Sequence, residues 1–230
     1  LVVWSILDRL TWTKASTIHT NSDFLVGRMY RHWLTTDNKE GRSKAKIRLV
    51  SFDHDGKEDR EKWWYRANDP MYLLTKSSGM QSTTKRKVRF DTWGESITKT
   101  YQFETEDGKE VEEKVTIRFT MASKDLREPF EGTDAGSLDY GKHAKKNIGV
   151  SIVRADRELE LDSRFGVSKD PRNRWWGAEI SFGPGMDIVF GVSNSKQHAE
   201  NLSGVANKDW DDFSEGSETW LQTKERLEEE

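Results

Sequence analysis

Cysteine is absent from all 230 residues of the sequence. Its absence excludes disulfide bonds, a thiolate nucleophile and zinc sites with cysteine ligands. Because a cysteine-free chain suits a reducing compartment, we expect a cytoplasmic protein. No apolar run approaches the roughly 20 residues of a membrane-spanning helix. No basic segment precedes the apolar opening stretch either, so neither a membrane partner nor a signal peptide is expected.

Apolar side chains are also scarce, at 33% of the residues, and an equal 33% are charged. Ten tryptophans and ten phenylalanines offset this lean composition, because each large ring buries about 150–250 Å². The net charge of −3 does not argue for a protein that coats nucleic acid. Five histidines are scattered without the H-E-x-x-H spacing of a zinc site, so no metal site is predicted.

One long helix among many strands is expected, which is the pattern of an α+β protein. The helix spans Thr13–Leu34, with Thr13 as its cap and an apolar stripe that includes Leu25 and Trp33. β-branched and alternating segments predict the strands. These are Leu1–Leu7, Ala45–Phe52, Lys87–Asp91, Ser96–Glu104, Glu110–Thr120, Ile148–Arg154, Glu158–Leu161 and Arg174–Phe182.

Tight turns are predicted at Asp55-Gly56, at Asp107-Gly108 and at Ala155-Asp156. A short helix is expected at Leu138–Lys146. The acidic end of the chain, Trp210–Glu230, is expected to be helical, with Phe213, Trp220, Leu221 and Leu227 available for packing. The chain opens inside a predicted strand, so we also expect it to be a piece of a longer protein.

Two well-known loop motifs are approached but not met. Gly136–His143 nearly matches the phosphate-binding P-loop, but His143 replaces the hydroxyl that binds Mg²⁺, and no apolar strand precedes the loop. We interpret it as a loop and a helix start, with Gly141 and Lys142 on the surface. Residues 51–62 resemble the start of a calcium loop, but a lysine stands at the closing acidic position. A hairpin turn explains that segment better.

The loop Ser193–Gln197, SNSKQ, carries one lysine, Lys196, and follows a strand, a Pro-Gly corner and a short apolar segment. A lysine ammonium is a compact charge on a flexible stem, which suits a terminal phosphate. During cleavage of a γ-phosphoryl group, a fixed cation offsets the charge on the equatorial oxygens. A lone loop lysine is most often a plain surface residue, so this interpretation depends on the surrounding sequence.

The order of several segments resembles the second domain of the GHKL ATPases, the superfamily of gyrase B, MutL, the ninety-kilodalton heat-shock chaperones and the MORC proteins. The likeness is greatest to MORC-like bacterial ATP-binding proteins. It extends from Leu1 to Leu202, and SNSKQ is its most specific motif. The segments that carry it are VVWSILDRL, GRMYRHWL, KIRLVSFD, RANDPMYL, HAKKNIGVSIVRADRELEL and RWWGAEISFGPGMDIVFGVSNSKQ.

This resemblance implies a transducer domain at residues 1–202, with the ribosomal-protein-S5-domain-2-like fold, inserted β-hairpins and a separate acidic segment at 203–230. In the family, a transducer lysine reaches the γ-phosphate of ATP bound in the preceding domain. Lys196 matches that lysine, and Asn194 and Gln197 would help to shape its loop. The implied cofactors are ATP and Mg²⁺. The implied partners are the chain's own N-terminal ATPase domain and a second copy in an ATP-dependent homodimer.

The sequence departs from the family in one respect. The ATP-binding motifs, which are an acidic-asparagine helix, a D-x-G-x-G loop and a Gly-rich lid, are not present. The strand Leu1–Leu7 resembles the last strand of an ATPase domain. We therefore expect this chain to supply one lysine to the site, with ATP and Mg²⁺ held mainly by a domain outside it, and to bind ATP weakly or not at all alone.

Two alternatives remain open. A non-enzymatic module could bind protein or nucleic acid through the tryptophan pairs Trp63-Trp64 and Trp175-Trp176, in each of which one strand side chain faces inward and the other outward. A local basic cluster could contact phosphate groups. The cluster consists of Lys85, Arg86, Lys87 and Arg89. A self-contained enzyme is the least favoured alternative, because no acid–base pair, nucleophile arrangement or metal set is apparent in the sequence.

Overall fold

The computed structural model describes most of the chain, namely residues 11–35, 44–59, 63–74, 77, 90–104, 108–165 and 170–229. Two sequence predictions fall outside these residues, the strand Leu1–Leu7 and the basic cluster Lys85, Arg86, Lys87 and Arg89. Both stay predictions. Within the described residues, none of the helices combines the length and the apolar character that crossing a membrane requires.

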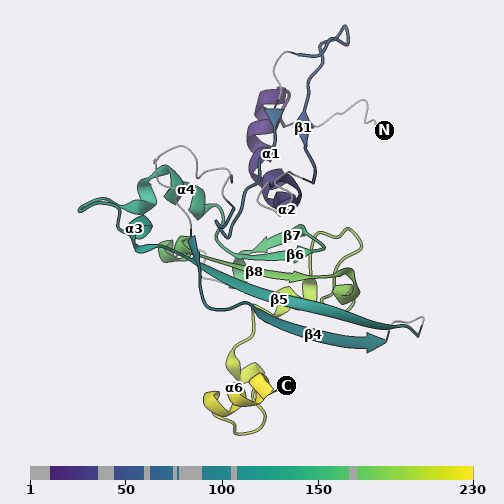
Figure 1. Ribbon diagram of the computed structural model, residues 1–230, viewed down its shortest axis with the longest axis vertical. Helices are drawn as coiled ribbons and strands as arrows, with labels where there is room; N and C mark the ends of the chain where they lie inside the picture. Colours follow the sequence, from purple (N-terminus) through teal and green to yellow (C-terminus); the bar gives the residue numbers. More distant parts are fainter. Residues whose placement is uncertain are drawn as a thin grey trace.

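The described chain is an α+β protein in which an N-terminal helix adjoins a mixed six-stranded sheet (Figure 1). The N-terminal helix α1 (Ala15–Met29) is followed directly by the short α2 (Arg31–Leu34). The sheet contains β3 (Phe90–Thr92), β4 (Ile97–Glu104), β5 (Glu110–Ala122), β6 (Val150–Arg154), β7 (Arg157–Asp162) and β8 (Trp176–Phe182). A separate pair is formed by β1 (Arg48–Leu49) and β2 (Trp63–Trp64).

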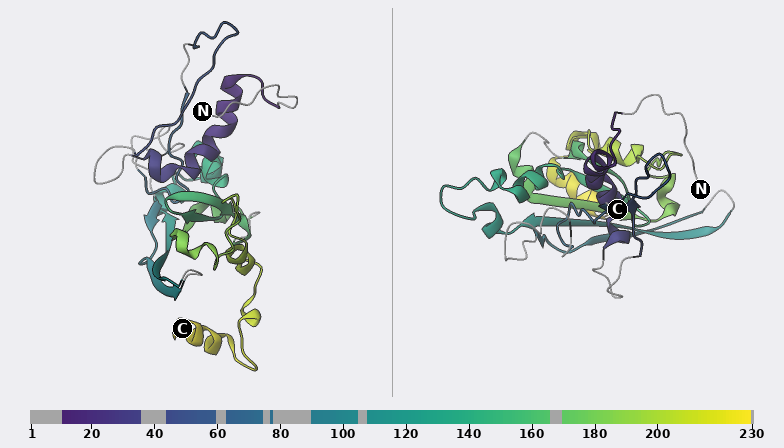
Figure 2. Two further views of the ribbon diagram at one scale, coloured as in Figure 1. Left: turned by 90° about the vertical axis from the view of Figure 1, so that its right-hand side faces the viewer. Right: turned by 90° about the horizontal axis from the view of Figure 1, so that it is seen from above.

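The strand order of the sheet is not the order of the chain. β4 pairs with residues 110–117 of the long strand β5 and β3 with its last three residues, and β8 pairs with β5 on its other side, all antiparallel. β6 then runs parallel to β8, and β7 completes the sheet antiparallel to β6. The α1 and α2 helices and the C-terminal helix α6 (Trp220–Glu229) lie at opposite ends of the long axis, with the sheet between them (Figures 1 and 2).

The two faces of the sheet differ in polarity because successive strand residues point to opposite sides. On one face, Val150, Ile152, Ala178 and Ile180 belong to the main apolar core. This core also takes in Met186 from η4 (Pro184–Asp187), the 3-10 turn after β8. On the other face, alternate residues of the same strands are polar and turn toward α1 and α2. They are Ser151, Glu158 and Glu179, all buried.

A second apolar cluster joins the end of the sheet to the helices α3 (Lys124–Arg127) and α4 (Asp139–Lys145), with Tyr72 and Tyr140 among its buried members. Gly141 of α4 is buried, and a Cβ there would clash with the carbonyl oxygen of Ala135. The prediction that Gly141 lies on the surface is therefore wrong, because the preceding turn packs directly on the helix.

The long helix was predicted correctly in outline but not in its packing. α1 begins at Ala15 after Lys14, and no side chain caps it, so the predicted cap at Thr13 is wrong. Leu25 and Trp33 of the predicted apolar stripe are 49% and 39% exposed. The buried positions are instead Gly27 and Arg31, because the helix packs on a polar sheet face and on the backbone around residue 68.

The predicted turns are confirmed. Ala155 and Asp156 both have positive φ, 47° and 65°, in the two-residue turn between β6 and β7, which is the geometry of a type I′ turn. Gly108, with φ 73°, lies in the β4–β5 hairpin. Gly56, with φ 76°, lies in the predicted hairpin of residues 53–57. The predicted strand Ala45–Phe52 shrinks to β1, because only two of its residues pair with β2.

A helical segment was predicted for Trp210–Glu230, but this acidic end is not one continuous helix. It contains a 3-10 turn, η5 (Trp210–Asp212), and then α6. Trp220, Leu221 and Leu227, expected to pack, are all more than two-fifths exposed. The second tryptophan pair is also not arranged as predicted, since Trp175 ends a 3-10 turn rather than lying in a strand, and both rings of that pair are half-buried.

Candidate functional site

The loop around Lys196 is a closed structure anchored at its base. Val192 and Ala199 form an antiparallel bridge below it, and the Ser193 amide donates to the carbonyl of His198 at 3.1 Å. At the tip, the Lys196 amide donates to the carbonyl of Ser193 at 2.8 Å, which closes a turn of four residues. The loop therefore presents its lysine from a defined backbone position.

Lys196 itself has a left-handed backbone with φ 54°, which is uncommon for a residue with a side chain and costs free energy. Its Nζ donates to Oδ2 of Asp187 at 2.7 Å. The lysine side chain is 39% exposed and the aspartate 19%. The ammonium is thus held in one place while part of it still faces solvent.

Asp187 is shared between two cations. Arg154, at the end of β6, donates to its two carboxylate oxygens at 2.5 and 2.9 Å, a two-pronged bond. Burial alone would raise the pKa of Asp187, but the bonds from Arg154 and Lys196 outweigh it and lower the pKa below its usual value. We call Arg154, Asp187 and Lys196 the Lys196 cluster. It contains two cations and one carboxylate.

The start and end of β7 hold the far side of the loop. Arg157 donates from Nη1 to the main-chain carbonyl of Lys196 at 3.1 Å. Glu160 accepts from the amide of Ala199 at 3.1 Å and from the hydroxyl of Ser203 at 3.2 Å. Its other oxygen lies 3.0 Å from Nδ1 of His198. The loop is therefore fixed to β6, to β7 and to the turn after β8.

The two other residues expected at this site lie in the same loop. Asn194 and Gln197 are both exposed, and the Gln197 amide lies 3.4 Å from the hydroxyl of Ser193. Sequence reasoning missed Arg154 and Asp187. The sequence did contain a signal for Asp187, because it is the one acidic residue in the otherwise apolar segment GMDIVF.

A second charged group lies on the polar face of the sheet, and we call it the Arg31 cluster. Arg31 is fully buried. It donates to Glu158 at 2.8 Å, to Glu179 at 2.5 Å and to the hydroxyl of Ser151 at 2.7 Å. Asp69 lies 3.8 Å from its Nε. The cluster also includes Arg28, bonded to Glu158, and Arg118, bonded to Glu179.

The Arg31 cluster contains three arginines and three carboxylates, and thus balances its charge. Burial alone would raise the pKa of Glu179, but His32, Arg31 and Arg118 together hold that pKa far below its usual range. Buried ion pairs of this kind fix the geometry of neighbouring elements, and they are costly to break. The cluster therefore fastens α1 and α2 to β6, β7 and β8.

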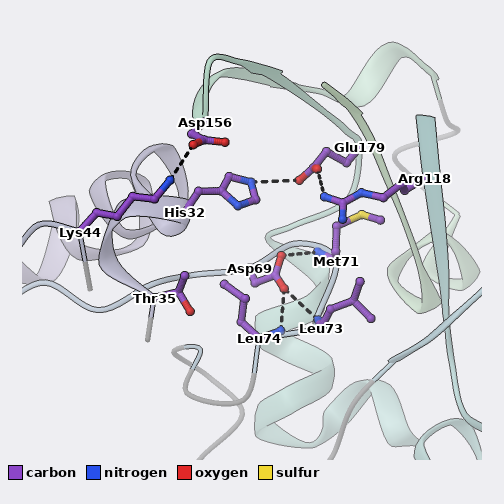
Figure 3. Close-up of a pocket in the computed structure, with 10 residues that line it drawn as sticks. All are labelled: His32, Thr35, Lys44, Asp69, Met71, Leu73, Leu74, Arg118, Asp156 and Glu179. Carbon is purple, nitrogen blue, oxygen red and sulfur yellow. Dashed lines mark hydrogen bonds and ion pairs between the residues drawn. The ribbon is translucent and has the colours of Figure 1, made fainter. Parts of the chain in front are cut away.

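A cavity of about 290 Å³ opens beside the Arg31 cluster (Figure 3). Its polar lining is already engaged. Lys44 is paired with Asp156 at 2.9 Å, and Asp69 accepts from the backbone amides of Met71, Leu73 and Leu74. His32 and Arg118 both face Glu179. Among the described residues of the lining there is neither a serine nor a cysteine.

The near-P-loop does not form a phosphate cradle. Gly136 lies in a 3-10 turn, and Gly141 lies inside α4. His143 is half-buried, with its Nδ1 2.9 Å from the hydroxyl of Tyr72. Burial, helped by the charge of Lys146, lowers the pKa of His143 to about 4. Among the residues that the structure describes, no group of three His, Asp or Glu side chains could hold a metal ion.

Comparison with protein-family models, with curated proteins and with solved structures found no match for this chain. The resemblance to the GHKL ATPases therefore rests on the sequence segments alone. The geometry of the site contributes one charged loop with a partly exposed lysine, and one balanced, buried charge cluster.

Proposed function

We propose that this chain is a transducer element of a MORC-like GHKL ATPase, in which Lys196 contacts the γ-phosphate of ATP. The observation that carries the proposal is the placement of the Lys196 ammonium, held by one carboxylate and 39% exposed on a loop that is bonded to β7 and closed by the Val192–Ala199 bridge. The ordered resemblance of the sequence supplies the identity of the ligand. A cation placed near a transferring phosphoryl group lowers the barrier because it offsets the negative charge on the phosphoryl oxygens.

ATP and Mg²⁺ belong mainly to a nucleotide-binding domain in this proposal. The described residues offer no cluster of metal ligands, so the Mg²⁺ is assigned to that domain. Lys196 supplies one positive charge to the phosphoryl oxygens, and Asn194 and Gln197 define the rim of its loop. When the γ-phosphate is present, the ammonium bonds to it, and after its loss the ammonium returns to Asp187. The two states of the lysine thereby favour two arrangements of the domains.

The finer fold is part of the same proposal. We assign residues 1–202 to a transducer domain of the ribosomal-protein-S5-domain-2-like fold. Its support is a mixed sheet in which β6 and β8 are parallel neighbours and an early helix, α1, packs on the polar face through Arg28. The long β4–β5 hairpin is an insertion in this scheme, and residues 203–230 are a separate C-terminal segment. An ATP-dependent homodimer is the oligomer that the resemblance favours.

The test measures ATP turnover and nucleotide affinity of the full-length protein that contains these 230 residues. We expect Lys196→Ala to lower turnover by about 100-fold or more, which is the usual effect of losing one charge-stabilising donor. Nucleotide affinity should stay within about threefold, because most of the binding contacts lie in the other domain.

The matched control is Lys142→Ala, which removes an exposed lysine from the near-P-loop. Turnover should be unchanged in this variant. The proposal is wrong if Lys196→Ala leaves turnover intact. A large loss of turnover in Lys142→Ala would instead favour a functional role for the near-P-loop, residues 136–143.

A further inference from the structure

We propose that Asp187 is the positioning residue for Lys196, and that Arg154 sets the position and the charge of Asp187. This inference rests on the proposed function of Lys196 and adds two residues to it. It concerns how the loop lysine is aimed before a phosphate arrives, a task for which the lysine alone is poorly suited.

A free lysine side chain has four rotatable bonds and a strongly hydrated ammonium, so it samples many directions. A cation that stabilises a phosphoryl group must already be near its final place. The left-handed backbone at Lys196 fixes where the stem leaves the loop. The 2.7 Å bond from Nζ to Asp187 then fixes where the stem ends.

Asp187 is itself held from two directions, which makes it a firm support. Its main-chain carbonyl accepts from the amide of Val192 at 2.8 Å. Its carboxylate accepts the two-pronged bond of Arg154. Arg154 in turn lies in register with Phe182 of β8. The support therefore reaches the ends of β6 and β8, and it does not depend on the exposed part of the loop.

The division of the two carboxylate oxygens also matters. Oδ1 accepts from Arg154 alone, whereas Oδ2 accepts from both Arg154 and Lys196. Because Arg154 already neutralises the carboxylate, Asp187 holds the ammonium without cancelling its charge. The cluster of two cations and one anion keeps a net charge of +1, so an arriving phosphate can compete for Lys196.

The competing explanation is that Asp187 only anchors η4 through Arg154. Turnover measurements in the full-length protein separate the two. If Asp187 positions Lys196, Asp187→Asn should lower kcat by about tenfold or more and leave the KM for ATP within about twofold, because the interaction acts in the transition state. In the Lys196→Ala background, Asp187→Asn should have no further effect. Asp187→Glu, which keeps the charge, should recover part of the loss.

Two further variants protect the test against a folding defect. Arg154→Gln should lower kcat in the same direction as Asp187→Asn, since it frees the same carboxylate. Asp170→Asn is the matched control, because it breaks a comparable two-pronged arginine bond, to Arg172, away from the loop. It should leave kcat unchanged.

Each outcome has one meaning. If Lys196→Ala lowers turnover but Asp187→Asn does not, the positioning role is wrong and the proposed function survives. If Asp187→Asn lowers turnover equally with and without Lys196, Asp187 acts as a structural anchor. If Lys196→Ala itself has no effect, the proposed function fails, and this inference fails with it.

Discussion

The Arg31 cluster and the Lys196 cluster use the same chemistry, cationic side chains on carboxylates, but the cations after which they are named differ in exposure. Arg31 is fully buried and shares three carboxylates with two other arginines. Lys196 is 39% exposed and shares one carboxylate with one arginine. The first cluster balances its charge and has no cation to spare. The second has one cation more than it needs, and this excess makes it the candidate for binding an anion.

The largest expected effect comes from breaking the buried member of the comparison. Arg31→Met leaves Glu158 and Glu179 ionised in a buried site with one cation fewer. We expect the free energy of unfolding to fall by about 3–5 kcal/mol, measured by urea denaturation followed through tryptophan fluorescence. Lys196→Met serves as the control, with a change below about 1 kcal/mol, because its ion pair is partly exposed. Equal losses in the two variants would remove the distinction between the clusters.

A pH titration of stability sharpens the comparison further, because it separates the Arg31 cluster from the half-buried His143. The pKa of His143 is lowered from 6.5 to about 4 by burial and by Lys146. The unfolded chain therefore binds a proton between these values and the folded chain does not. Stability should fall by up to about 3 kcal/mol as the pH drops from 6.5 to 4.

His143→Gln should flatten this pH dependence, as measured by urea denaturation at several pH values between 4 and 7. Glu179 contributes in the same direction only below about pH 5, where the unfolded carboxylate, with its ordinary pKa of 4.5, takes up a proton that the folded one does not, so the slopes are compared above that pH. A slope that persists unchanged in His143→Gln would assign the titration to another group and contradict the prediction.

The smallest effect is expected at the Lys196 cluster itself. A double-mutant cycle of Asp187→Asn and Lys196→Met should give a coupling free energy for folding below about 1 kcal/mol. Raising the salt to about 0.5 M should reduce it further, because exposed charges are screened. A coupling of several kcal/mol would mean that this pair is part of the scaffold, as the Arg31 cluster is, and would argue against a lysine that can leave its partner.

Local chemistry predicted the elements well. The turns at Gly108 and at Ala155-Asp156 contain Gly108 and Asp156, residue types that tolerate positive φ, and they defined the hairpins on either side. The parallel pairing of β6 with β8 could not be predicted in the same way, because it joins strands that are not consecutive in the chain. No turn chemistry marks such a pair.

The charged clusters were harder to predict than the elements. Arg31 stands in a helix whose apolar residues dominated the interpretation, and its partners Glu158 and Glu179 lie 127 and 148 residues away. Lys196 was selected from its loop, but its support by Arg154 and Asp187 depends on the way the sheet places the end of β6 beside η4. The local sequence is enough to select the lysine, but it does not predict which carboxylate pairs with it.

The guanidinium of Arg157 gives the molecule a mechanical linkage. One of its nitrogens bonds the backbone of Lys196, and the group lies over the ring of Tyr30, where α1 ends, at 5.9 Å from the ring centre. The helix that is fastened by the buried arginine and the loop that presents the lysine thus meet at a single side chain. A tilt of α1 against the sheet would be transmitted to the lysine as a shift of its backbone, and a pull on the loop would be transmitted back to the helix.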